Sequence, residues 1–171
     1  ANAKYEVFAR EDIYDPSNDG TIIYKKGTVV DTIITKLDGK GTSKELPLGE
    51  YSIKEVNAPE GFVLSDEVKN VSLKYKDQNT AIVFDNTSFT NERQKVEINV
   101  YKKDAENDVG LLGATFGLYA KEEIKNYKDE IVVKAGTLIE SATSDTEGKV
   151  HFTSDLPLTN FEIKEIQAPI G

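Results

Sequence analysis

The sequence predicts an all-β protein made of two tandem β-sandwiches, and three observations lead to this prediction. Short segments with alternating apolar and polar residues are separated by turn signals such as Asp38-Gly39 and Glu147-Gly148. Hydrophobic residues make up 38% of the chain and charged residues 30%, which suits a folded protein with a core. The 171 residues also contain an internal repeat, and each copy is long enough to form a whole domain.

The repeat is clearest where Leu46–Gly61, which reads LPLGEYSIKEVNAPEG, recurs as Leu156–Gly171, which reads LPLTNFEIKEIQAPIG. A second match joins Ala3–Ala9 to Ala114–Ala120, again at an offset of about 110 residues. This period is far longer than a solenoid repeat, so the copies are predicted to be complete domains.

The two copies of the repeat have different flanking segments. Residues 96–112 precede the match in the second copy, whereas residues 62–86 follow the signature of the first copy. We therefore expect a first sandwich over residues 1–90 without its first strand. We expect a second sandwich over residues 91–171 without its last strand, and a polar linker over residues 87–95.

Period-2 alternation places the individual strands. In chain order, strands are expected at Thr28–Thr35, Tyr51–Glu55, Val68–Tyr75, Ala81–Asn86, Val96–Lys102, Thr137–Thr143 and Phe161–Glu165. Two short segments, Ala9–Ile13 and Ala120–Lys125, have the composition of one or two helical turns.

Four polar residues fall on the core-facing side of these strands. Glu55 follows the register of Tyr51 and Ile53, and Glu165 holds the same place in the second copy. Lys102 continues the face of Val96, Ile98 and Val100, while Asn86 continues the face of Ile82 and Phe84. A single such residue is most simply a strand end at the solvent-exposed rim. Four of them, with the Glu repeated, favour groups that are buried and paired.

These segments resemble the Cna B-type, SpaA-type prealbumin-like domains of Gram-positive surface proteins and pilins. The resemblance rests on Leu46–Phe62, on Ile98–Asp104 followed by Leu112–Tyr119, and on the Asp145–Lys149 turn. It covers almost the whole chain and implies two prealbumin-like, Ig-like β-sandwiches.

The resemblance also implies a self-modification. In such domains a first-strand Lys forms an isopeptide bond with a last-strand Asn, assisted by the signature Glu. Carried over, Lys102 is the candidate Lys, Asn86 the candidate Asn, and Glu55 and Glu165 the assisting carboxyls. In this frame the first copy has no partner Lys and the second no partner Asn, so neither copy closes its own bond.

Several other functions are disfavoured by composition. The net charge of −9, without a basic cluster, argues against nucleic-acid binding. No apolar run approaches the ~20 residues that span a bilayer. Without cysteine, and with His151 as the only histidine, no metal or cofactor site is predicted. No catalytic triad can be assembled, so we expect the protein not to be an enzyme.

The resemblance implies an extracellular stalk or scaffold module of a sortase-anchored cell-wall protein or pilin. Its expected partners are the neighbouring domains of the same surface protein. The absence of Cys and Met suits an oxidising exterior. The alternative is an adhesin domain that binds a host matrix protein or glycan. Tyr14, Tyr24 and Tyr127 lie in candidate loops for such binding but form no aromatic cluster.

Overall fold

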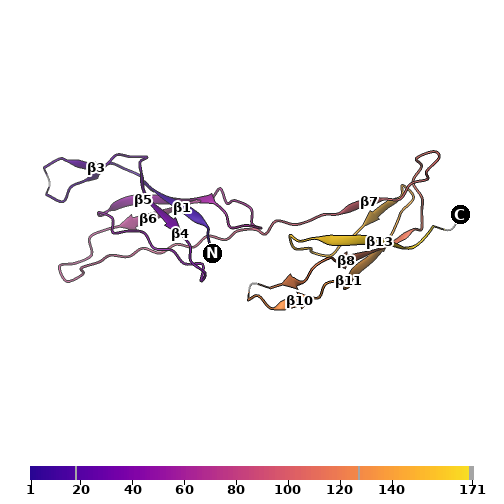
Figure 1. Cartoon of the computed structure of the whole chain (residues 1–171). Helices are drawn as coiled ribbons and strands as arrows, with labels where there is room; N and C mark the ends of the chain where they lie inside the picture. Colours follow the sequence, from indigo (N-terminus) through magenta and orange to yellow (C-terminus); the bar gives the residue numbers. More distant parts are fainter. Residues whose placement is uncertain (18, 127, 170–171) are drawn as a thin grey trace. The chain divides into compact units, whose positions relative to one another are not determined.

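A computed structural model describes residues 1–17, 19–126 and 128–169 of the chain. The chain divides into two compact units, Ala1–Arg93 and Gln94–Gly171. The described residues contain strands and no helix (Figure 1). The protein is therefore all-β, as the sequence predicts.

Unit 1, Ala1–Arg93, is organised around a four-stranded antiparallel sheet in the order β4-β1-β5-β6. A short pair, β2 and β3, forms a separate hairpin. The strands are β1 Lys4–Ala9, β2 Ile13–Tyr14, β3 Ile22–Tyr24, β4 Val29–Ile34, β5 Gly49–Asn57 and β6 Val68–Leu73. In β1 every second residue is buried, so the sheet has one face on the core.

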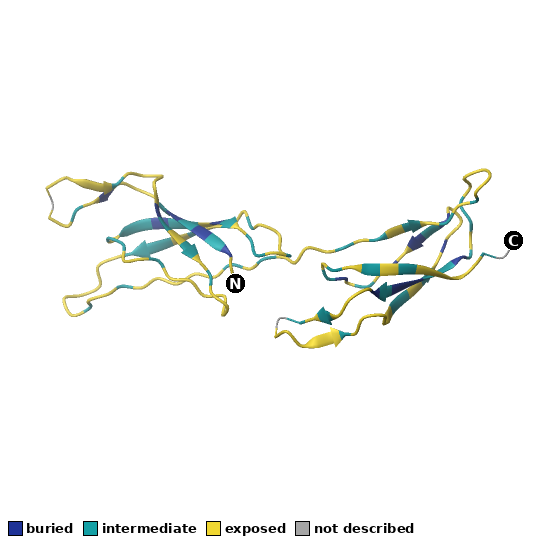
Figure 2. Cartoon of the chain, in the orientation of Figure 1, coloured by how far each residue is buried: buried dark blue, intermediate teal, exposed yellow. Residues whose placement is uncertain are grey.

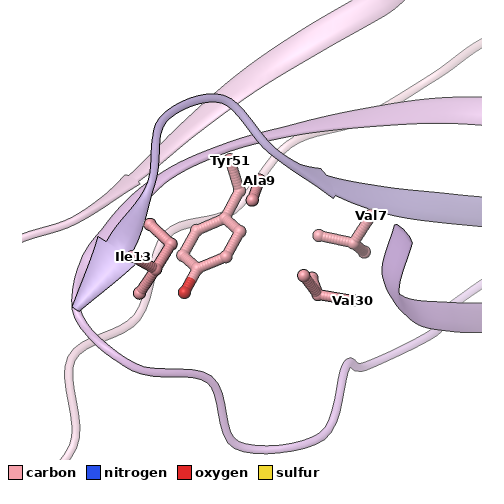
Figure 3. Packing of buried hydrophobic residues seen from close by; sticks show 5 residues of the cluster. All are labelled: Val7, Ala9, Ile13, Val30 and Tyr51. Atoms are coloured by element: carbon pink, nitrogen blue, oxygen red, sulfur yellow. The ribbon is translucent and has the colours of Figure 1, made fainter. Parts of the chain in front are cut away.

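The core of unit 1 gathers the inward side chains of several strands (Figure 3). It consists of Val7, Ala9, Ile13, Val30 and Tyr51. The Tyr51 ring is fully buried, and its hydroxyl donates a hydrogen bond to the Pro47 carbonyl oxygen at 2.7 Å. The polar end of this core residue is thereby satisfied.

Unit 2, Gln94–Gly171, has two sheets that contribute to a common core. Strands β11-β8-β13 form one sheet and β12-β7 form another, while β10 and β9 form a separate hairpin. The strands are β7 Asn99–Tyr101, β8 Thr115–Ala120, β9 Ile124–Lys125, β10 Ile131–Val133, β11 Leu138–Thr143, β12 Lys149–His151 and β13 Phe161–Gln167. Leu118, Val150, Phe152 and Leu156 are the buried centre, and Val96, Ile98 and Val100 pack on it. Figure 2 shows buried positions on the strands of both units and, in unit 2, also on the segments that connect them.

The central strands of the two units use one register. Tyr5 of β1 lies opposite Glu55 of β5, and Phe116 of β8 lies opposite Glu165 of β13. The sequence repeat is therefore a structural repeat, which places the two signature glutamates at equivalent points.

Two expectations about local structure are wrong. Ala9–Ile13 and Ala120–Lys125 are not helical, because each forms a bend between the end of one strand and the start of a hairpin. The Ile13 side chain is 2% exposed and joins the unit 1 core from the first residue of β2.

The expected strand over Ala81–Asn86 does not form either. Ile82 and Phe84 are 56% and 76% exposed, so their face does not point inward. The Asp85 carboxylate instead accepts a hydrogen bond from the Ser72 backbone N–H at 2.8 Å. This side-chain bond takes the place of a backbone ladder beside β6.

Candidate functional site

Glu55 lies at the inner face of unit 1, where the alternation of β5 places it after Tyr51 and Ile53. Its side chain is completely buried, at 0% exposure. The sequence therefore predicted the orientation of this carboxyl correctly. A buried carboxylate is costly unless hydrogen bonds or a cation compensate for the lost water.

The two oxygens of Glu55 have different surroundings. Its Oε2 atom accepts hydrogen bonds from the Ser65 backbone N–H at 2.9 Å and from the Asn91 side-chain amide at 2.6 Å. Its Oε1 atom is buried and has no hydrogen-bond partner among the described residues. The Tyr5 phenol, opposite Glu55 on β1, also interacts with this carboxyl.

Tyr5 lies opposite Glu55 on the neighbouring strand β1, and Phe89 packs against Tyr5. The Tyr5 and Phe89 ring centroids are 4.8 Å apart. Burial, together with the negative charge of Glu55, raises the pKa of Tyr5 to about 12. The phenol therefore stays neutral at physiological pH, next to the carboxyl.

Asn91 is positioned by backbone contacts between its neighbouring residues and the segment that follows β5. The Val63 backbone N–H donates to the Glu92 carbonyl oxygen at 2.8 Å, and Phe62 forms an isolated antiparallel bridge with Arg93. The Asn91 amide also donates to the Val63 carbonyl oxygen at 3.2 Å. Residues 91–93 therefore pack with unit 1, although the sequence analysis set the boundary at residue 90.

The structure does not bring Asn86 to Glu55. Asn86 is exposed and lies on the wall of a groove in unit 1, whereas the amide that reaches Glu55 belongs to Asn91. The sequence analysis missed Asn91 because residues 87–95 look like a polar linker. The sequence Phe89-Thr-Asn91, in which an aromatic and an amide residue alternate, is the pattern that could have indicated a strand-like segment here. In the structure Phe89 and Asn91 are both half-buried.

Unit 2 pairs its signature Glu with the candidate Lys. Lys102 Nζ lies 3.0 Å from Glu165 Oε2, but the expectation that both groups are buried is wrong, because Glu165 is exposed and Lys102 is only partly buried. The Lys102 and Glu165 side chains are 28% and 32% exposed, so this pair is more accessible than Glu55. Lys102 follows β7, and its backbone N–H donates to the Gly148 carbonyl oxygen at 2.8 Å.

The signature Glu thus occupies the same position in both units but has a different partner in each. In unit 1 the carboxyl contacts an Asn amide, and in unit 2 it contacts a Lys ammonium. An amine, an amide and a carboxyl are the groups that amide exchange requires. Each unit holds two of them in contact.

Other kinds of site find no support in the described residues. No cluster of three or more His, Cys, Asp or Glu side chains there could hold a metal ion. No helix in this part of the chain is long and apolar enough to cross a membrane. Of the three loop tyrosines, Tyr14 is 55% exposed, Tyr24 packs against the unit 1 core, and Tyr127 lies outside the described residues.

Comparison with known proteins points to one domain family. Residues 1–88 and 96–171 each match the SpaA domain, described as a prealbumin-like fold domain. No curated protein matches the chain.

Among solved structures, the chain is similar to the TIE protein of Bacillus anthracis, with 25% identity and a TM-score of 0.62. That similarity covers 98% of this chain and 25% of the other, so the chain spans about a quarter of that protein. A streptococcal ancillary pilin matches at 20% identity and a TM-score of 0.36, covering 99% of this chain and 50% of that one. The shaft pilin SpaA of Lactobacillus rhamnosus GG matches at 18% and 0.35, covering 98% and 78%.

Proposed function

Because the chain belongs to the SpaA family of prealbumin-like fold domains, with one copy in each unit, we propose that it is a pair of structural stalk modules. They would belong to an extracellular surface protein or pilin of a Gram-positive bacterium, anchored to the cell wall. The partners in this role are the neighbouring domains of the same protein. The role is mechanical, so it needs rigid, chemically resistant domains and no turnover.

The observation that carries this proposal is the placement of the signature Glu in both units. Glu55 contacts the Asn91 amide at 2.6 Å, and Glu165 contacts the Lys102 ammonium at 3.0 Å. These contacts support domains of the type that is stabilised by an internal Lys–Asn isopeptide bond. Asn91 replaces Asn86 as the candidate Asn, because Asn91 contacts the signature Glu55 and Asn86 does not.

The bond-forming step is a single amide exchange. A neutral Lys Nζ attacks the Asn Cγ atom, and a new Cγ–Nζ bond forms while the Cγ–Nδ2 bond breaks. The carboxyl accepts a proton from the attacking amine and returns one to the leaving nitrogen, which departs as ammonia. One amide and one amine give one secondary amide and one ammonia, so no oxidant or cofactor is required.

The surroundings of Glu55 suit this step. A dry site favours the neutral form of an amine, which is the form that attacks the amide carbon. Glu55 is fully buried, Tyr5 lies opposite it on β1, and the Phe89 ring packs against Tyr5. The carboxyl contacts the amide nitrogen that departs as ammonia, so it is well placed to deliver a proton there.

Intact-mass spectrometry tests the proposal. The present chain should keep its full calculated mass, because its Asn91 and Lys102 lie in different units. A protein extended at both ends by one domain should lose roughly 17 Da for each bond formed. Glu55→Ala and Asn91→Ala should each abolish the loss from unit 1.

Asn86→Ala is the matched control, since Asn86 is an exposed amide of the same unit. It should leave the mass loss unchanged. If the extended protein shows no loss, or if Asn86→Ala removes it while Asn91→Ala does not, the assignment is wrong.

A further inference from the structure

The two units differ in the residue that lies opposite the signature Glu. Tyr5 of β1 lies opposite Glu55 of β5, whereas Phe116 of β8 lies opposite Glu165 of β13. These two positions are equivalent in the sequence repeat. Tyr and Phe differ by one hydroxyl group, so unit 1 places a hydroxyl at a position where unit 2 has none.

The burial of the two carboxyls differs in parallel with this hydroxyl. Glu55 is fully buried, whereas the Glu165 side chain is 32% exposed and lies 3.0 Å from the Lys102 ammonium. A carboxylate that water and a cation reach keeps its charge without further help. A carboxylate in a dry site needs hydrogen-bond donors, because burial favours the neutral acid. The hydroxyl is therefore present in the unit whose carboxyl is buried.

The donors around Glu55 leave room for one more. Its Oε2 atom accepts hydrogen bonds from the Ser65 backbone N–H and the Asn91 amide, which are both neutral, and its Oε1 atom accepts none from the described residues. Burial, the charge of Glu55 and a hydrogen-bonding interaction with its side chain together raise the pKa of Tyr5 to about 12. At neutral pH the phenol therefore keeps its proton and acts toward the carboxylate as a donor.

The Tyr5 ring is fixed by its surroundings, which defines where its hydroxyl lies. Tyr5 is 9% exposed, and its ring centroid is 4.8 Å from that of Phe89. The Lys69 ammonium lies 5.6 Å from the Phe89 ring centroid and forms an ion pair with Glu67 at 2.8 Å. This nearby cation is thus paired with Glu67, and the group that faces Glu55 from β1 is the phenol.

Packing of the ring does not explain the hydroxyl. Phe116 fills the equivalent place in unit 2 without one. A buried hydroxyl costs free energy unless it has a hydrogen-bond partner. The core residue Tyr51 has such a partner in the Pro47 carbonyl oxygen. For Tyr5 the group opposite is the carboxyl of Glu55.

We propose that Tyr5 is a positioning residue of the unit 1 site, whose hydroxyl donates a hydrogen bond to the Glu55 carboxyl and holds it in the ionised form. The ionised carboxyl is the form that accepts a proton from the attacking amine. The effect on bond formation rests on the isopeptide function proposed above, whereas the hydrogen bond does not. In unit 2 the exposed Glu165 carboxyl does not need this donor.

The hydrogen bond is tested on the 171-residue chain by carbon NMR with isotopically labelled glutamate. At pH 7 this measurement distinguishes a carboxylate from a carboxylic acid at each Glu side chain. Glu55 should be a carboxylate in the wild type, and its signal should move toward that of the acid in Tyr5→Phe. The Glu165 signal should stay where it is in this variant. Phe116→Tyr is the matched control and should leave the Glu165 signal unchanged.

The effect on bond formation is tested on the protein extended at both ends by one domain. After cell-free synthesis, mass spectrometry of proteolytic fragments follows the loss of ammonia in each unit separately. Tyr5→Phe should slow the loss in unit 1 by about tenfold or more, since a hydrogen bond to a charged group is removed. Phe116→Tyr should leave the rate in unit 2 unchanged.

The outcomes separate this proposal from the isopeptide function. An extended wild-type protein that loses no ammonia contradicts the isopeptide function, while the Glu55 signal in Tyr5→Phe still decides whether the hydrogen bond exists. The proposal is overturned if Tyr5→Phe leaves the Glu55 signal unchanged. It is also overturned if unit 1 loses ammonia at the same rate with and without the Tyr5 hydroxyl.

Discussion

At the scale of single residues, Glu55 has the least usual surroundings in the molecule. Among the described residues, Glu55 is the charged residue whose side chain is fully buried. One of its carboxyl oxygens, Oε1, accepts no hydrogen bond from these residues. The other oxygen is the acceptor for the Ser65 N–H and the Asn91 amide. Removing the carboxyl leaves these two donors without their acceptor, which costs more than losing an exposed contact.

We expect Glu55→Ala to lower the free energy of unfolding of unit 1 by about 1–3 kcal/mol. The matched change Glu165→Ala removes a carboxyl that is 32% exposed, and should cost unit 2 less than about 1 kcal/mol. Urea denaturation followed by tyrosine fluorescence measures both, since the chain has no Trp. Equal costs for the two variants would contradict the different burial of the two carboxyls.

Glu140 of β11 forms hydrogen bonds with the loop that follows β12. Its two oxygens accept hydrogen bonds from the Thr153 backbone N–H and hydroxyl and from the Ser154 backbone N–H, at 2.9–3.0 Å. Backbone donation by Thr153 is the main reason that the pKa of Glu140 falls from 4.5 to about 2. Asp31 has a similar place on β4 and accepts a hydrogen bond from the Lys44 N–H at 2.8 Å.

These hydrogen bonds of Glu140 predict that the stability of unit 2 falls at acid pH. Because the pKa of Glu140 is lower in the folded state, its contribution to stability is complete above about pH 4.5 and is lost as the pH falls toward 2. Urea midpoints measured between pH 7 and pH 2 should fall less steeply for Glu140→Gln than for the wild type. Glu147→Gln, a change at an exposed turn, should follow the wild-type curve.

At the scale of elements, period-2 alternation predicted the strands that have one face on a core. The expected segments Thr28–Thr35, Val68–Tyr75 and Thr137–Thr143 correspond to β4, β6 and β11. The signature segments correspond to β5 and β13, and the inward orientation of Glu55 follows from the same count. The signal is reliable here because burial on one side imposes it.

The same reasoning failed where burial does not impose the pattern. Residues 81–86 alternate, yet Ile82 and Phe84 are exposed, so alternation gave the wrong Asn. Asn91 is positioned by long-range pairing between Val63 and Glu92, which no local pattern reveals. The hairpins β2–β3 and β9–β10 were missed because their strands have only two or three residues each.

The crossing between β7 and the turn at Gly148 gives a prediction about an element contact. Gly39→Ala and Gly148→Ala impose similar strain at φ of +76°, of about 1 kcal/mol. Gly148→Ala also forces its Cβ against the backbone of Lys102 and Gly110, which should cost at least about 1 kcal/mol more. Denaturant midpoints would reveal the difference. Indistinguishable values would mean that β7 does not pack on this turn as described.

At the scale of the whole molecule, each unit has its own core. The unit 1 cluster is formed by residues 7–73, and the unit 2 cluster by residues 96–163. We therefore expect two separable unfolding transitions by calorimetry. Glu55→Ala should shift one transition and Gly148→Ala the other. A single transition that moves with both variants would contradict this independence.

The shared register of the central strands has a kinetic consequence. β1 pairs with β4 on one edge and with β5 on the other, and the β5 residues lie more than forty positions further along the chain, so the second edge of β1 can pair only once β5 is available. Meanwhile β8 has almost the same shape and the same opposing position for a glutamate, since Phe116 faces Glu165 as Tyr5 faces Glu55. A chain that refolds from denaturant can therefore pair β1 with β13, or β8 with β5, before the correct sheets form. Refolding should show a slow phase that depends on both repeats being present, because the repeat that gives the two units the same fold also offers each strand a second partner.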